Sequence, residues 1–183
     1  MPDFDTSEAG APAHRLAPAA PDEEYVFGAC SPGWHSAADH SASTADWIQS
    51  MRANDIERVC CLLPGCESPS DVDAKLFDDG FGADRTLHAP VPDGRLVNPA
   101  LLKQEVIPFL EAAVEAEERV VVVCLDGMGR TGQVLAAWLA HDRGFGPNRA
   151  IETVESTGRL PCEPVYADNA SEQELIDLLA IFA

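Results

Sequence analysis

The sequence predicts an α/β domain in which helices flank a central, largely parallel β-sheet. Short apolar runs alternate along the chain with segments that have helical periodicity. The most apolar run, Val120–Leu125, begins with four consecutive valines, which is typical of a strand buried on both faces of a parallel sheet. The chain has 183 residues, of which 46% are hydrophobic, so one domain with a full core is expected.

Four apolar runs bounded by turn residues are predicted to form strands. Gly28 ends the first, Pro64 and Gly65 bound the second, and Pro90 ends the third. The expected strands are Glu24–Gly28, Ile56–Leu63, Arg85–Ala89 and Val120–Leu125.

Capping residues mark where the predicted helices begin and end. Pro99 suits a first helical position, Pro108 is expected to kink the same helix, and Ser171 with Glu174 resembles a capping box. The expected helices run from Ser43 or Thr44 to Ala53, Ser70 to Asp79, Asn98 to Glu118, Arg130 to His141, Pro147 to Thr157 and Ser171 to Phe182.

The amino-terminal segment differs in composition from the rest of the chain. Residues 1–23 are rich in Ala, Pro, Asp and Glu, which predicts an acidic flexible tail ahead of a domain over residues 24–183. The segment has neither a basic start nor an apolar stretch, and no apolar run reaches the ~18 residues of a membrane span. We therefore expect a soluble, cytoplasmic protein, and a monomer.

The balance of charged residues indicates which classes of binding partner to expect. The chain has 31 acidic and 12 basic residues, a formal net charge of -19, and only two lysines, Lys75 and Lys103. Nucleic acid and anionic membranes attract clustered basic residues, so neither is an expected partner. The composition resembles that of proteins from extreme halophiles, whose carboxylates repel one another less because concentrated salt screens them.

The six cysteines show no pattern typical of a metal site. They stand at positions 30, 60, 61, 66, 124 and 162, with no C-x2-C pair and no closely spaced histidine pair. Neither a metal nor structural disulfides are expected in this intracellular chain.

The stretch from Val120 to Gly132 carries the chemistry. Cys124 ends the strongest strand, a loop with two glycines follows, and Arg130 opens a helix. Backbone amides gathered at a helix amino terminus form an anion-binding cradle, and the helix dipole there favours a thiolate, so we expect a lowered pKa for Cys124. The alternative is a core thiol beside an ordinary turn. A cation such as Arg130 opposes the helix dipole at this end, however, and a bound anion resolves that conflict.

These residues resemble the signature of the cysteine-dependent protein tyrosine phosphatases of the dual-specificity type: His-Cys, five residues, Arg, then Ser or Thr. Cys124, Arg130 and Thr131 match it, together with the usual glycines. The resemblance extends over residues 24–183. It implies a three-layer phosphatase fold, hydrolysis of phosphate monoesters without a cofactor, and a phosphorylated protein or a small phosphate ester as substrate.

The resemblance also implies a catalytic role for individual residues. Cys124 would attack phosphorus, Thr131 would stabilise the departing thiolate, and Asp93, about thirty residues earlier, would be the general acid, with Asp84 as the alternative. Gln173 resembles a glutamine that places water. The phosphate would be held by Leu125, Asp126, Gly127, Met128, Gly129 and Arg130.

Two residues depart from the family pattern. Val123 stands where the family usually has the histidine that braces the loop, and Asp126 places a carboxylate inside the loop. Val123 leaves open a noncatalytic protein that binds phosphorylated partners. A third class, a thiol oxidoreductase or sulfur carrier using Cys124, is disfavoured by Arg130 and Asp93.

Overall fold

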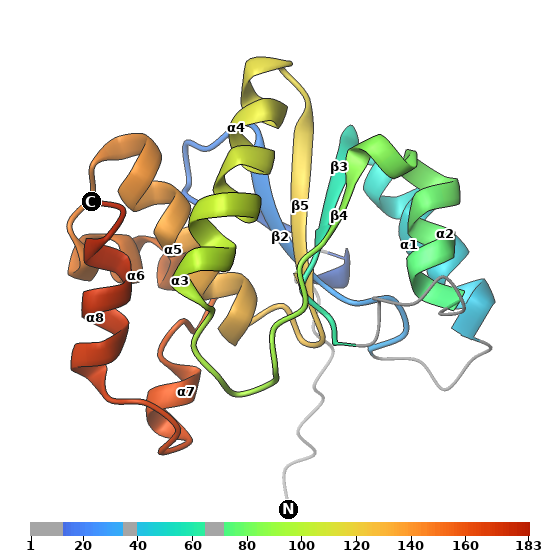
Figure 1. The fold of residues 1–183 in the computed structure, drawn as a ribbon. Coiled ribbons are helices and arrows are strands. Elements are labelled where there is room, and N and C mark those ends of the chain that lie inside the picture. The colour runs from blue at the N-terminus through green and yellow to red at the C-terminus, as the bar shows by residue number, and fades with distance from the viewer. Residues whose placement is uncertain (1–12, 35–39, 65–71) are drawn as a thin grey trace, which may run out of the picture.

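The computed structural model describes residues 13–34, 40–64 and 72–183. Within them a five-stranded sheet has the order β1-β2-β5-β3-β4 (Figure 1). β1 pairs antiparallel with β2, and the other neighbouring strands pair in parallel. The predicted α/β class with a largely parallel sheet is confirmed. The strands are Ala17–Pro18 (β1), Val26–Cys30 (β2), Ile56–Cys61 (β3), Thr86–His88 (β4) and Arg119–Cys124 (β5).

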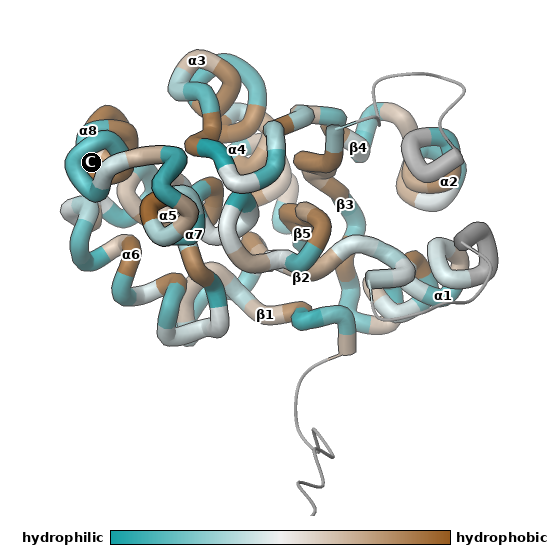
Figure 2. The backbone as a smooth tube through the Cα atoms, turned by 90° about the horizontal axis from the view of Figure 1, so that it is seen from below, coloured by the Kyte–Doolittle hydropathy of each residue, from teal (hydrophilic) through white to brown (hydrophobic). Residues whose placement is uncertain are grey.

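Helices cover both faces of the sheet, which gives the expected three layers. α1 and α2 lie on one face, whereas α4, α5, α6 and α8 lie on the other (Figures 1 and 2). The helices are His40–Ala53 (α1), Val72–Phe81 (α2), Pro99–Leu101 (α3), Ile107–Glu115 (α4), Gly129–Arg143 (α5), Pro147–Ser156 (α6), Glu163–Tyr166 (α7) and Glu172–Ala180 (α8).

The central strand β5 joins two hydrophobic cores. Val120 and Val122 face the larger core under α4, α5, α6 and α8, while Val121 and Val123 face the smaller core under α1 and α2. All four side chains are fully buried, as their uninterrupted run predicts.

The segment expected to form one kinked helix from Asn98 to Glu118 is divided in three. Asn98 caps α3, a π-helical turn spans Leu102–Val106, and α4 follows with Pro108 at its start. Pro108 has no amide to donate, so the widened turn before it absorbs the interruption. At the other end of the chain, the predicted capping box of Ser171 and Glu174 is present.

The chain before residue 24 differs from the expected flexible tail where it is described. β1 pairs with β2, and Ala19 and Ala20 are buried. Arg143 of α5 holds the segment by ion pairs to Asp22 at 2.7 Å and Glu23 at 3.1 Å. Residues 13–23 are therefore part of the domain. Residues 1–12, and the Ser70 expected to cap α2, lie outside the described residues.

Parallel strands end at the same edge of the sheet, and this topology creates the site. The carboxyl ends of β2, β5 and β3 bring the segments that follow them together. Hydrogen bonds link these neighbours directly: Ser31 donates to the carbonyl of Leu125, and Leu62 donates to that of Val123.

Candidate active site

Cys124 is the last residue of β5, and α5 begins only five residues later. The residues between them, 125–128, are here called the cradle loop. Gly127 has a φ of +74°, and a Cβ placed on it would lie 2.7 Å from the backbone carbon of Ala29. Only glycine allows both this left-handed conformation and the close approach of the loop to β2.

The carbonyls of the cradle loop all accept hydrogen bonds from groups outside it. Leu125 O accepts from Ser31 N and Oγ, Asp126 O from Arg15, Gly127 O from Arg159, and Met128 O from Leu160 N. Within a peptide unit the N–H points away from the C=O. The amides of residues 126–129 therefore point toward the inside of the loop, as an anion cradle requires.

Cys124 lies at the base of this cradle. Its side chain is fully buried, and Thr131 Oγ1 donates a hydrogen bond to Sγ at 3.1 Å. Burial raises the pKa of the Cys124 thiol, opposed by the hydrogen bonds from Thr131 and the charge of Arg130. The expectation of a lowered pKa is thus wrong, because desolvation outweighs the favourable partners.

Arg130 lies on the first turn of α5 with its guanidinium directed inward. The residue is only 2% exposed, and Nη1 donates to the carbonyl of Val91 at 3.0 Å. Nη2 lies 2.9 Å from Oδ1 of Asp93, whose side chain is largely exposed. The structure therefore brings Cys124, Thr131, Arg130 and Asp93 into one site.

The segment that carries Asp93 is held by two amide side chains. Gln133 of α5 is buried; its Oε1 accepts from Val97 N at 2.8 Å and its Nε2 donates to Arg95 O at 3.2 Å. Asn169 Nδ2 donates to Gly94 O at 3.0 Å. These bonds tie residues 94–97 to α5 and to the α7–α8 connection. Asp93 is therefore presented from a braced turn.

Two other predicted residues lie elsewhere. Gln173 is exposed on α8, and its Nε2 donates to Asp177 of the same helix at 2.7 Å. Asp84, the alternative acid, precedes β4 and so lies at the amino edge of the sheet, opposite the cradle. The structure brings neither side chain to Cys124.

Arg159 is the main site residue that sequence reasoning missed. It is 3% exposed and donates to three carbonyls, of Gly127 at 2.6 Å, Arg15 at 2.7 Å and Gly28 at 2.8 Å. It thus fastens the cradle loop to β2 and to the amino-terminal segment, and burial lowers its pKa to about 10. With Val123 in the place of a bracing histidine, Arg159 supplies a brace from the loop after α6.

Glu163 is the second missed residue. A Cβ on Gly129 would collide with its carboxylate, which therefore lies against the start of α5. Burial, then the charges of Asp126 and Asp93, raise the pKa of Glu163, while Arg130 acts in the opposite direction. Asp126, Asp93 and Arg130 thus all lie close enough to Glu163 to influence its ionisation. A glutamate after a Pro-Cys pair carries no sequence signal for this role, because only the packing of α7 on α5 creates it.

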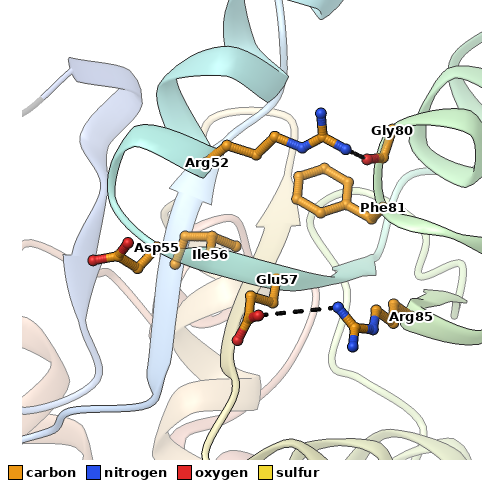
Figure 3. Close-up of a pocket in the computed structure, with 7 residues that line it drawn as sticks. All are labelled: Arg52, Asp55, Ile56, Glu57, Gly80, Phe81 and Arg85. Carbon is orange, nitrogen blue, oxygen red and sulfur yellow. Dashed lines mark hydrogen bonds and ion pairs between the residues drawn. The ribbon is translucent and has the colours of Figure 1, made fainter.

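A separate depression of about 450 Å³ lies at the amino edge of the sheet, away from the cradle (Figure 3). Its arginines are already engaged: Arg52 donates to the carbonyl of Gly80, and Arg85 pairs with Glu57 at 4.0 Å and with Glu118 at 2.7 Å. It offers no group arranged for chemistry. Its lining is Arg52, Asp55, Ile56, Glu57, Gly80, Phe81 and Arg85.

The geometry of the cradle agrees with a comparison against protein families. The model for "Polymorphic toxin system, DSP-PTPase phosphatase" matches residues 35–143, more than half of the chain. The chain belongs to this DSP-PTPase family. The matched range contains Asp93, Cys124 and Arg130, but it ends before Arg159 and Glu163.

Several solved structures have the same fold as this DSP-PTPase. Tk-PTP in its active form is 22% identical, with a TM-score of 0.63 over 87% of this chain and 92% of that one. PTPMT1 in complex with PI(5)P is 13% identical, with a TM-score of 0.66 over 91% and 96%. TpbA of P. aeruginosa is 21% identical, with a TM-score of 0.55 over 92% of both chains. No curated protein matches the sequence.

None of the helices in the described part of this DSP-PTPase is both long enough and apolar enough to cross a membrane.

Proposed function

We propose that the protein is a phosphate monoester hydrolase that acts through a phosphocysteine on Cys124. Phosphorylated tyrosine, serine or threonine in a protein is the first substrate class, and a small phosphate ester such as an inositol phosphate is the second. The observation that carries this proposal is the buried Cys124 sulfur at the start of a loop whose carbonyls all bond to groups outside it, together with the buried Arg130.

In the first step the Cys124 thiolate attacks phosphorus in line with the leaving oxygen. An S–P bond forms as the P–O bond breaks. The loop amides and the guanidinium of Arg130 stabilise charge on the three remaining phosphoryl oxygens. Asp93, protonated, gives its proton to the leaving oxygen, and its contact with Arg130 in the free protein supports this placement.

In the second step water attacks the phosphocysteine. Asp93, now ionised, accepts a proton from that water, an O–P bond forms, and the S–P bond breaks. The Thr131 hydroxyl, which already donates to Sγ, stabilises the departing thiolate. Water placement by Gln173 stays a prediction.

A second candidate function is noncatalytic binding of phosphorylated partners. Val123 in place of histidine favours it, as does the burial that raises the pKa of the Cys124 thiol. A binder needs the cradle and Arg130 but not a thiolate. The two candidates therefore differ in turnover and share the affinity for oxyanions.

Hydrolysis of an aryl phosphate by wild type, Cys124→Ser and Asp93→Asn separates the candidates. We expect turnover to vanish in Cys124→Ser. Asp93→Asn should slow an alkyl phosphate more than an aryl phosphate, because the poorer leaving group depends more on the acid. Asp84→Asn is the matched control and should keep wild-type turnover. Binding of a phosphopeptide by wild type without any turnover would favour the binder, and full alkyl-phosphate turnover in Asp93→Asn would remove the acid assignment.

We also propose that the protein works in a salt-filled cytoplasm. The support is its net charge of -19 and its low lysine content. Screening at about 1 M salt shortens the Debye length to ~3 Å, so the melting temperature should rise with KCl. Equal melting temperatures in low and multimolar KCl would remove this proposal.

A further inference from the structure

The carboxylate of Asp126 points into the cradle. Its Oδ1 accepts a hydrogen bond from the backbone amide of Met128 at 2.9 Å. The same oxygen lies 3.7 Å from the Sγ of Cys124, which donates its S–H. Asp126 thus contacts both the nucleophile and one of the amides that would hold the phosphate.

These two contacts define the position that a phosphoryl oxygen would take. For in-line attack the phosphorus must lie above Sγ, with its oxygens at the inward N–H groups of the loop. The N–H of Met128 belongs to that set, since the carbonyl of Gly127 is turned outward by Arg159. An oxygen that accepts from Met128 N next to Sγ therefore lies where the substrate's own oxygen would bind.

The surrounding charges make this carboxylate a real competitor for the phosphate. Arg130 on α5 and Arg159 from the loop after α6 attract an anion at this position. Asp126 acts against a second anion there: its charge opposes ionisation of Cys124 and also of Glu163 on α7. A phosphate dianion that enters beside an unmoved Asp126 would meet the same repulsion.

We propose that Asp126 competes with oxyanions for the site: its carboxylate occupies the phosphoryl-oxygen position and must leave it before an oxyanion binds. The inference deepens the proposed function by naming what substrate phosphate displaces. It concerns oxyanion binding itself, so it is measurable without turnover.

The decisive experiment measures tungstate binding calorimetrically at pH 7.5 for wild type, Asp126→Asn and Asp126→Ala. Asn keeps an oxygen acceptor for Met128 N but removes the charge, whereas Ala removes both. We expect about tenfold tighter binding in Asp126→Asn, about 1.4 kcal/mol, and at least as much in Asp126→Ala. Glu163→Gln is the matched control: it loses the same charge near Arg130 without touching Sγ or Met128 N, so its change should be smaller, about twofold.

A second measurement follows alkylation of Cys124 by iodoacetamide, with mass spectrometry of its peptide between pH 6 and 10. Because Asp126→Asn removes the Asp126 charge, its alkylation rate should rise at lower pH than that of wild type. The pH dependence of the alkylation rate in Glu163→Gln should stay near that of wild type. Thermal melts show that each variant is folded. If Asp126→Ala does not fold, the result for Asp126→Asn decides alone, because Asn keeps an oxygen acceptor for the amide of Met128.

Tungstate affinity no higher than wild type in a folded Asp126→Asn would overturn the proposal and leave Asp126 as a residue that only stabilises the turn. Failure of the proposed function looks different. Wild type would then hydrolyse no phosphate ester, while the Asp126 variants would still bind tungstate more tightly.

Discussion

The two edges of the sheet differ in how deeply their arginines are buried. At the carboxyl edge Arg130 and Arg159 are 2% and 3% exposed and donate to backbone carbonyls, and Arg130 also pairs with the exposed carboxylate of Asp93. At the amino edge the side chain of Arg85 is 40% exposed and pairs with the carboxylate of Glu118 at 2.7 Å. An exposed ion pair contributes little to stability, because water and salt screen it.

A buried guanidinium held by carbonyls keeps its charge in a fixed place. Carbonyl oxygens satisfy the donors of Arg159 and one donor of Arg130 without neutralising these cations, and the carboxylate that pairs with Arg130, that of Asp93, is largely exposed and screened by water. Positive potential near Cys124 is therefore retained for an anion.

At the amino edge Arg85 instead pairs with the carboxylates of Glu57 and Glu118, while Arg52 donates to the carbonyl of Gly80. The depression in Figure 3 also contains arginines, but Arg52 is exposed and the side chain of Arg85 is 40% exposed, so solvent screens their charges.

The largest expected difference between the edges is in catalysis. Arg130→Lys keeps the positive charge but loses the planar fork that matches two phosphoryl oxygens, so kcat for an aryl phosphate should fall by about 10²–10³-fold. The same change at Arg85 should alter kcat less than about twofold, because its partners Glu57 and Glu118 lie at the amino edge, away from the cradle. Steady-state assays of both variants decide this, and equal losses would show that the edges do not differ as described.

The next effect is on stability. Arg159→Met leaves carbonyls of Gly127, Gly28 and Arg15 without their donor, and we expect the free energy of unfolding to fall by about 3 kcal/mol. Arg85→Met should cost less than about 1 kcal/mol. Urea denaturation measures both. A loss below about 1 kcal/mol in Arg159→Met would mean that the brace is dispensable and that other contacts orient the cradle loop.

The smallest effect compares two glycines with similar left-handed backbones. Gly127 has a φ of +74° and lies against Ala29, whereas Gly144 ends α5 with a φ of +62° and open space around it. Gly144→Ala should lower the free energy of unfolding by about 1 kcal/mol, the conformational cost alone. Gly127→Ala should lower it by about 1 kcal/mol more, since the loop must also move away from β2, and it should weaken tungstate binding. Equal effects would show that the cradle loop is loosely packed.

The sequence alone determined the parts of the site that lie close together along the chain. Cys124, the cradle loop, Arg130 and Thr131 span one strand, one turn and one helix start, so local backbone geometry is sufficient to place them. Asp93 came from its distance to Cys124 in the family pattern, and the structure brings it to Arg130. The valines of β5 predicted the parallel sheet because burial on both faces leaves a continuous apolar run.

Only the tertiary structure decided what surrounds that motif. Arg159 and Glu163 reach the cradle through the packing of α6 and α7 on α5, and Arg15 arrives through β1, so no spacing in the sequence marks them. The direction of the Asp126 side chain and the raised pKa of Cys124 likewise depend on desolvation and on charges from distant segments. The local sequence specifies hydrogen bonds between residues that are close along the chain. The burial of a group and the electrostatic potential at it depend on atoms from the whole fold.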